Sequence, residues 1–163
     1  MATHVVIGDP HCTPKASNER FLWAGRLAAD VRATHIICMG DFCSMDSLSS
    51  YDKKKKSFEG RRYQKDMQHS HEALSLFNKG LGKHKARKIM LHGNHEDRID
   101  RFVDENPELD GTLKISDLNF KQYGWQEVPY KQNKVLNGVY YAHHFPSGIP
   151  VSYTHLTLPT TAY

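Results

Sequence analysis

Three short apolar runs, each followed by a glycine, constrain the fold of this chain most strongly. HVVIGD (4–9), THIICMGD (34–41) and RKIMLHG (87–93) have the β-branched and aliphatic composition of buried strands. Helical spacing of apolar residues predicts a helix over 17–32, between the first two runs. A strand, a helix and a strand in this order form a βαβ unit, which requires parallel strands and a right-handed crossover.

The later part of the chain adds further predicted elements. Apolar residues at helical spacing predict a helix over 61–81, and a short charged helix is expected over 97–106, before Pro107. The segment 134–144 is typical of a β-hairpin with Asn137-Gly138 as its two-residue turn. The expected fold class is therefore α/β, with parallel strands first and antiparallel strands late.

Polar residues follow the apolar strands where each strand ends. In open α/β sheets, ligands bind in the crevice beyond the carboxyl ends of the strands. Carboxylate, amide and imidazole groups at that edge suit manganese, iron or zinc. Four strand ends deliver such groups, in the segments Gly8-Asp9-Pro10-His11, Gly40-Asp41, Gly93-Asn94-His95-Glu96 and Ala142-His143-His144.

Each of these segments also has an ordinary structural explanation. A Gly-Asp pair after a strand is most often a turn, and a single histidine usually has a structural role. We find no packing reason for four strands to end in this way. The combined pattern therefore predicts a centre that holds two divalent ions, with one carboxylate bridging them.

The order and spacing of these blocks carry a resemblance to a known family. GDPH, GDFCS, GNHE and YYAHHF resemble the successive signature blocks of the calcineurin-like metallophosphoesterase superfamily. The segments FEGRRY, GNHEDRIDR, NPEL and YGW are similar to its phage and environmental branch, and the match extends over residues 4–149. The resemblance implies a four-layer α/β/β/α sandwich, incomplete at its C-terminus. It also implies hydrolysis of a phosphomonoester or phosphodiester by a metal-activated hydroxide.

The resemblance also implies a role for individual residues. Asp9 and His11 would bind the first metal, Asp41 would bridge both, and Asn94 and His143 would bind the second. The general acid or phosphate-stabilising residue would be His95. Three neighbouring residues are weaker candidates for substrate binding: Arg98, Asp97 and His144. Arg98 would bind phosphate and Asp97 would orient His95. For both Arg98 and Asp97, a surface salt bridge is the alternative role.

The chain departs from the family pattern at its end. The fifth block, Gly-His-x-His, is missing, and the single late histidine, His155, has neither the glycine nor the second histidine. The stretch SYTHLTLPTT resembles a translated adapter read-through. We therefore expect a partial phosphoesterase domain at 1–150 and a non-native tail at 151–163, which leaves the activity of the chain as written open.

The net charge of +4 is concentrated in one basic segment, residues 51–65. Such a segment can attract polyanions, although a solvated loop is the alternative. It favours a nuclease among the possible phosphoesterases, while the core motifs fit a phosphomonoesterase or a cyclic-nucleotide diesterase equally well. The second hypothesis is a nucleic-acid-binding or scaffold protein that keeps the fold without hydrolysis. The basic residues are Lys53, Lys54, Lys55, Lys56, Arg61, Arg62 and Lys65.

Composition predicts a cytoplasmic protein without a membrane partner. No apolar run approaches the roughly 20 residues that a membrane-spanning helix needs, and the N-terminus lacks the pattern of an export signal. Cys12, Cys38 and Cys43 cannot all pair with one another, and none lies in a CxxC motif. Free thiols in a reducing compartment are therefore expected.

Overall fold

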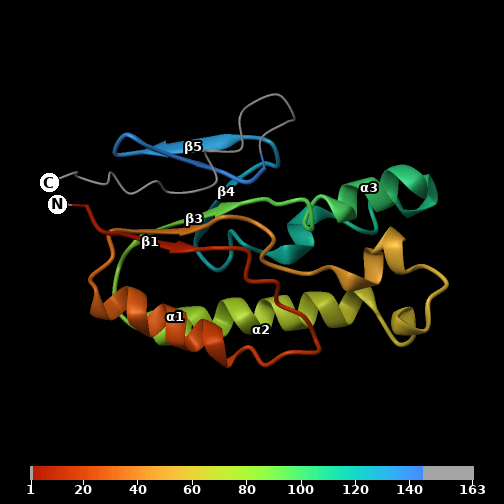
Figure 1. The fold of residues 1–163 in the computed structure, drawn as a ribbon, viewed down its shortest axis with the longest axis horizontal. Coiled ribbons are helices and arrows are strands. Elements are labelled where there is room, and N and C mark those ends of the chain that lie inside the picture. The colour runs from red at the N-terminus through yellow and green to blue at the C-terminus, as the bar shows by residue number, and fades with distance from the viewer. Residues whose placement is uncertain (1, 145–163) are drawn as a thin grey trace, which may run out of the picture.

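The structure is a computed structural model that describes residues 2–144 (Figure 1). The predicted 151–163 tail, the domain end at 150 and His155 lie outside the described residues. Three α-helices are present in the described part: α1 (Glu19–Asp30), α2 (Tyr63–Leu81) and α3 (Arg98–Glu105). The strands are β1 (His4–Ile7), β2 (His35–Cys38), β3 (Arg87–Leu91), β4 (Trp125–Val128), β5 (Asn133–Leu136) and β6 (Val139–Ala142). Short 3-10 turns cover Asp46–Leu48, Ser50–Asp52, Lys56–Phe58, Pro107–Leu109 and Ile115–Leu118.

The first four strands form one parallel sheet in the order β1-β2-β3-β4. This confirms the α/β class and the parallel βαβ unit. The fourth strand corrects the sequence analysis, which predicted no strand at 125–128. Only its two end residues, Trp125 and Val128, are buried, so the segment lacks the continuous apolar run of its neighbours. Its strand conformation follows from pairing with β3.

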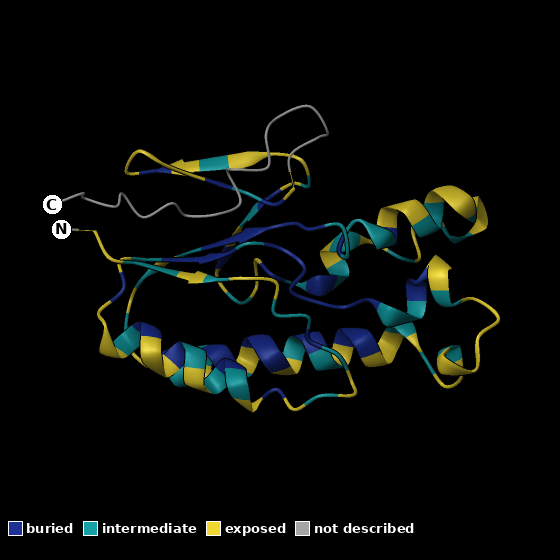
Figure 2. Cartoon of the chain, viewed as in Figure 1, coloured by how far each residue is buried: buried dark blue, intermediate teal, exposed yellow. Residues whose placement is uncertain are grey.

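Alternate residues of the central strands face opposite sides of the sheet, as the pleat requires. Helices α1 and α2 cover one face, and the hairpin covers the other (Figure 1). Strands β2 and β3 are buried between them (Figure 2). The helix side of the core includes Ile36, Cys38 and Met90, and the hairpin side includes Ile37, Ile89, Leu91, Leu136 and Tyr141.

Two glycines allow α1 and α2 to pack closely. A Cβ atom on Gly25 would collide with the Phe77 carbonyl oxygen, and one on Gly80 would collide with the Leu22 carbonyl oxygen. The helices therefore meet backbone to backbone at this point. The second helix ends at Leu81, where Gly82 adopts the positive φ that favours glycine.

The predicted hairpin and its turn are confirmed. Strands β5 and β6 pair antiparallel from the Leu136–Val139 pair outward, and both Asn137 and Gly138 have positive φ, as a tight two-residue turn requires. The two nitrogens of His4 on β1 contact the Tyr141 hydroxyl and the Asn137 side-chain oxygen. These contacts fix the hairpin against the sheet and so position the residues that follow β6.

Two further expectations can be compared with the described residues. Cys12, Cys38 and Cys43 are free and buried. None of the described helices combines the length and apolar character needed to cross a membrane.

Candidate metal centre

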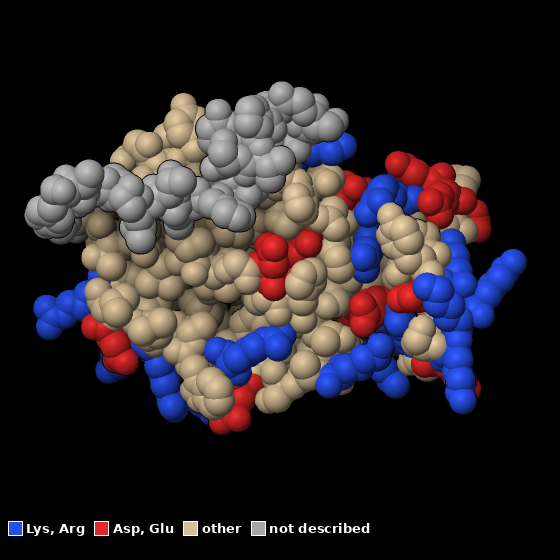
Figure 3. Space-filling model, viewed as in Figure 1, with Lys and Arg blue, Asp and Glu red and all other residues tan. Residues whose placement is uncertain are grey.

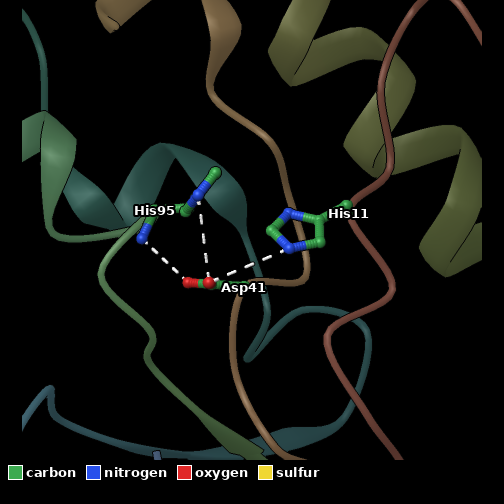
Figure 4. A group of neighbouring side chains, drawn as sticks. All are labelled: His11, Asp41 and His95. Atoms are coloured by element: carbon green, nitrogen blue, oxygen red, sulfur yellow. Dashed lines mark hydrogen bonds and ion pairs between the residues drawn. The ribbon is translucent and has the colours of Figure 1, made fainter. Parts of the chain in front are cut away.

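Asp41 lies at the middle of the predicted site. It follows β2, its side chain is almost fully buried, and its Oδ1 accepts a 2.9 Å hydrogen bond from the His95 backbone N–H. Its Oδ2 lies 4.0 Å from His11 Nε2 and 3.9 Å from His95 Nε2 (Figure 4). One donor atom from each of these three residues could contact a common metal ion.

The other carboxylate oxygen of Asp41 faces a second set of side chains. Asp41 Oδ1 lies 3.5 Å from His143 Nε2, and His143 Nε2 lies 3.1 Å from the side-chain oxygen of Asn94. The structure therefore brings together Asp41, Asn94 and His143, three of the predicted ligands. Because its two oxygens face different sets, Asp41 has the position expected of a bridging carboxylate.

The tautomer of His143 shows what this second set can bind. Its Nδ1 lies 2.7 Å from the Met39 carbonyl oxygen, which can only accept a hydrogen bond, so Nδ1 carries the proton. In the neutral ring Nε2 then holds a lone pair, which points at the Asn94 oxygen and the Asp41 carboxylate. With the ring neutral, these three electron-pair donors converge on one point, an arrangement that fits a cation. A backbone carbonyl that orients the far nitrogen is also the usual partner of a metal-binding histidine.

His95 has the same arrangement. Its Nδ1 donates to the Ser44 carbonyl oxygen at 2.7 Å, and its Nε2 faces Asp41 and the Arg98 guanidinium, 3.1 Å away. Burial lowers the pKa of His95, with the nearby Asp41 carboxylate acting in the opposite direction. The neutral ring is therefore favoured, and its Nε2 lone pair, which faces the Arg98 guanidinium, is available to a metal ion.

Asp9 and His11 were expected to bind the first metal together, but Asp9 is not part of the group that His11 forms with Asp41 and His95. The Asp9 carboxylate is 56% exposed, and its Oδ1 lies 3.6 Å from His143 Nδ1. The group around Asp41 Oδ2 instead contains His11 and His95. Asp9 is thus placed at the edge of the centre, on the His143 side.

The backbone is strained where the predicted ligands leave their strands. Asp9, His11 and Asp41 have φ values of 28°, 45° and 47°, a region that residues other than glycine rarely occupy. A hydrogen bond from the His11 N–H to the Asp41 carbonyl oxygen, 3.0 Å long, joins two of these loops. Strained residues of this kind concentrate at functional sites, where the surrounding structure holds them in place.

Two of the three glycines in the predicted blocks are required by the centre. Gly40 has φ +106°, and a Cβ atom there would lie 2.6 Å from His143 Nδ1. A Cβ atom on Gly93 would collide with the Asp41 side chain. At Gly8 nothing lies within 4 Å of such an atom, so this glycine is not explained by contact with the centre.

Glu96 is a structural part of the centre that the sequence analysis assigned no role. It is fully buried, and its carboxylate accepts hydrogen bonds from the backbone N–H groups of Asp41 (3.0 Å), Cys43 (3.0 Å) and Gly93 (2.7 Å). These contacts tie the loop after β2 to the loop after β3. Burial raises the pKa of Glu96 to about 7, against the lowering effect of the N–H donors. Its position beside Asn94 and His95 in the GNHE block was the available sequence signal.

The three weaker substrate-binding candidates have different surroundings. Arg98 donates to the Ser44 carbonyl oxygen at 2.8 Å and lies beside His95, as a phosphate-binding group would. Asp97 pairs with Arg101 at 3.1 Å, the salt-bridge alternative, and its carboxylate has no described contact with His95. His144 is exposed, and its ring lies edge-on to His143 with 4.4 Å between the ring centroids.

Comparisons of the chain with protein-family models and with curated proteins found no match.

Proposed function

We propose that this chain is a metal-dependent phosphoesterase of the calcineurin-like superfamily. The observation that carries the proposal is the convergence of electron-pair donors on both oxygens of Asp41. Asn94 and His143 face one oxygen, and His11 and His95 face the other. Oxygen and imidazole donors in this combination suit manganese, iron or zinc.

The protein groups around the centre have complementary tasks in phosphate-ester hydrolysis. Divalent ions bound here would polarise the phosphate and supply a nucleophilic water near neutral pH. Arg98 forms no ion pair with a carboxylate in the described part of the chain, although its guanidinium is half-buried. Its planar group is therefore available to a phosphate oxygen. His95 Nε2, beside it, would donate to the same phosphate when the ring carries a second proton.

The proposed family also implies the four-layer sandwich. Helices, parallel sheet and hairpin account for three successive layers. Val135 and Tyr140 pair on the hairpin face that points away from the sheet and are exposed, at 46% and 69%. An exposed apolar surface on this element supports a further layer packed against it.

The alternative, a nucleic-acid-binding or scaffold protein without hydrolysis, depends on the basic segment. Several of its charges are engaged within the protein: Lys53 pairs with Glu105, and both Lys55 and Arg61 pair with Asp52. These ion pairs reduce the positive charge that the segment offers to a polyanion. The basic segment therefore gives the alternative little support, and the convergence of donors on Asp41 favours the phosphoesterase.

Turnover of bis(p-nitrophenyl) phosphate tests the proposed function. We expect turnover with Mn²⁺ and none after EDTA treatment. Asp41→Asn should reduce the rate by more than the roughly 10- to 100-fold typical of residues that only orient ligands. Asp30→Asn, the same change at the exposed end of α1, is the matched control. Equal rates for the two variants would contradict the proposal, as would salt-dependent DNA binding without any turnover.

A further inference from the structure

We infer that a groove beside the metal centre binds a nucleotide of a single-stranded polynucleotide, with Tyr51 as its stacking platform. This inference rests on the proposed phosphoesterase activity and names its substrate class. The groove lies between the Ser50–Asp52 turn and α3. Its lining includes two arginines, two aromatic rings and one carboxylate: Arg98, Arg101, Tyr51, Phe102 and Glu105. Lys and Arg side chains gather at this end of the molecule, interspersed with Asp and Glu side chains (Figure 3).

Arg98 makes the groove continuous with the metal centre. One of its terminal nitrogens lies 3.1 Å from His95 Nε2, and the other donates to the Ser44 carbonyl oxygen at 2.8 Å, while the side chain also lines the groove. A phosphate that reaches His95 therefore lies next to the groove. The part of the substrate attached to that phosphate can extend into it.

Arg101 supplies a second cation one helical turn further along. Its Nε pairs with Asp97 at 3.1 Å, and a terminal nitrogen donates to the Asn94 carbonyl oxygen at 3.0 Å. These contacts hold the guanidinium beside the loop that carries Asn94. More than half of the side chain stays exposed, so it can also contact a neighbouring phosphate of a polynucleotide.

Tyr51 provides the aromatic surface of the groove. It is 80% exposed, the highest exposure among the large hydrophobic side chains of the described residues. Phe102 and Glu105, which also line the groove, are both contacted by Lys53, whose Nζ lies 5.4 Å from the centre of the Phe102 ring and 3.7 Å from the Glu105 carboxylate. An exposed ring next to two arginines matches a base attached to a phosphate backbone.

The chemistry selects a single strand over a duplex. A base can stack on a protein ring only when its face is free, and in a duplex both faces are covered by neighbouring base pairs. Stacking of this kind tolerates every base, because each has a π-face. The groove therefore favours single-stranded substrates without requiring a particular sequence.

Fluorescence anisotropy of a short fluorescein-labelled single-stranded oligonucleotide, measured in EDTA, tests the inference. Tyr51→Ala should weaken binding at least about five-fold, the lower limit for loss of one stacked base. Tyr51→Phe, which keeps the ring, should stay within about two-fold of the unmodified chain. Tyr140→Ala is the matched control, an exposed tyrosine on the hairpin that should leave binding unchanged.

Three results would overturn the groove assignment: no oligonucleotide binding by the unmodified chain, equal affinities for Tyr51→Ala and Tyr140→Ala, or equally tight binding of the matching duplex. Because EDTA removes metal ions, this assay does not depend on turnover. Tyr51-dependent binding without metal-dependent turnover would reject the hydrolytic function alone. Turnover of the small diester together with Tyr51-independent binding would reject the groove alone.

Discussion

At the scale of single residues, the backbone conformation of Gly40 determines where the His143 side chain can lie. The positive φ of Gly40 and the short distance to His143 both act against a side chain at this position. The residue therefore sets how closely the loop after β2 can approach the residue that follows β6.

Replacing Gly40 with alanine should displace His143 from Asp41. The expected loss is about 1–3 kcal/mol of unfolding free energy, from overpacking and the strained φ together. Gly8→Ala is the control, because Gly8 has neither a close neighbour nor a positive φ. Urea denaturation measures both variants. Equal stability of the two would show that the contact between Gly40 and His143 does not constrain the centre.

The site residues that could be predicted from the sequence are those that directly follow a strand, because their side chains gather at one edge of the sheet. Asp41, Asn94 and His143 lie together as the block pattern indicated. Glu96 could not be assigned in the same way, because its partners are backbone N–H groups from two separate loops. Those partners come together only when β2 and β3 pair.

At the scale of elements, Asp66 joins α2 to the Asp46–Leu48 turn, which follows the loop that carries Asp41. Its Oδ2 accepts hydrogen bonds from the backbone N–H of Ser47 at 3.0 Å and from the Ser47 hydroxyl at 2.6 Å. Burial raises the pKa of Asp66, although the Ser47 hydrogen bonds act in the opposite direction. The folded protein therefore holds a proton on this group more tightly than the unfolded chain does.

This shift predicts how the stability contribution of Asp66 depends on pH. Because the pKa is higher in the folded state, the contribution is full below the unfolded pKa and is lost as pH rises through the folded pKa. The difference in unfolding free energy between the unmodified chain and Asp66→Asn should therefore be more favourable to aspartate at pH ~4 than at pH ~7. Denaturant titrations at both values measure it. A difference that stays constant or grows toward pH ~7 would contradict the raised pKa.

Element prediction succeeded where the local pattern was strong. The three apolar runs, both long helices and the Asn137-Gly138 turn were all predicted, with helix ends within two residues of those observed. Strand β4 was missed because polar residues stand between Trp125 and Val128. Its conformation depends on backbone pairing with β3, which local sequence does not encode.

At the scale of the whole molecule, chain topology assembles the centre from distant segments. Parallel strands place Asp41 and Asn94 at one edge of the sheet, and the hairpin on the opposite face from the helices returns His143 to the same edge. The class of fold followed from the order of predicted elements. The packing of the hairpin on the sheet did not, because it depends on contacts such as that of His4 with Tyr141.

Calorimetric titration of the metal-free protein with Mn²⁺ measures the proposed cation binding at Asp41 without requiring a substrate. We expect saturable binding that Asp41→Asn abolishes or weakens by more than about 100-fold and that Asp30→Asn leaves intact. A protein that binds no Mn²⁺, or that binds it equally well with asparagine at position 41, would contradict the assignment of Asp41 as the carboxylate at the centre of the metal site.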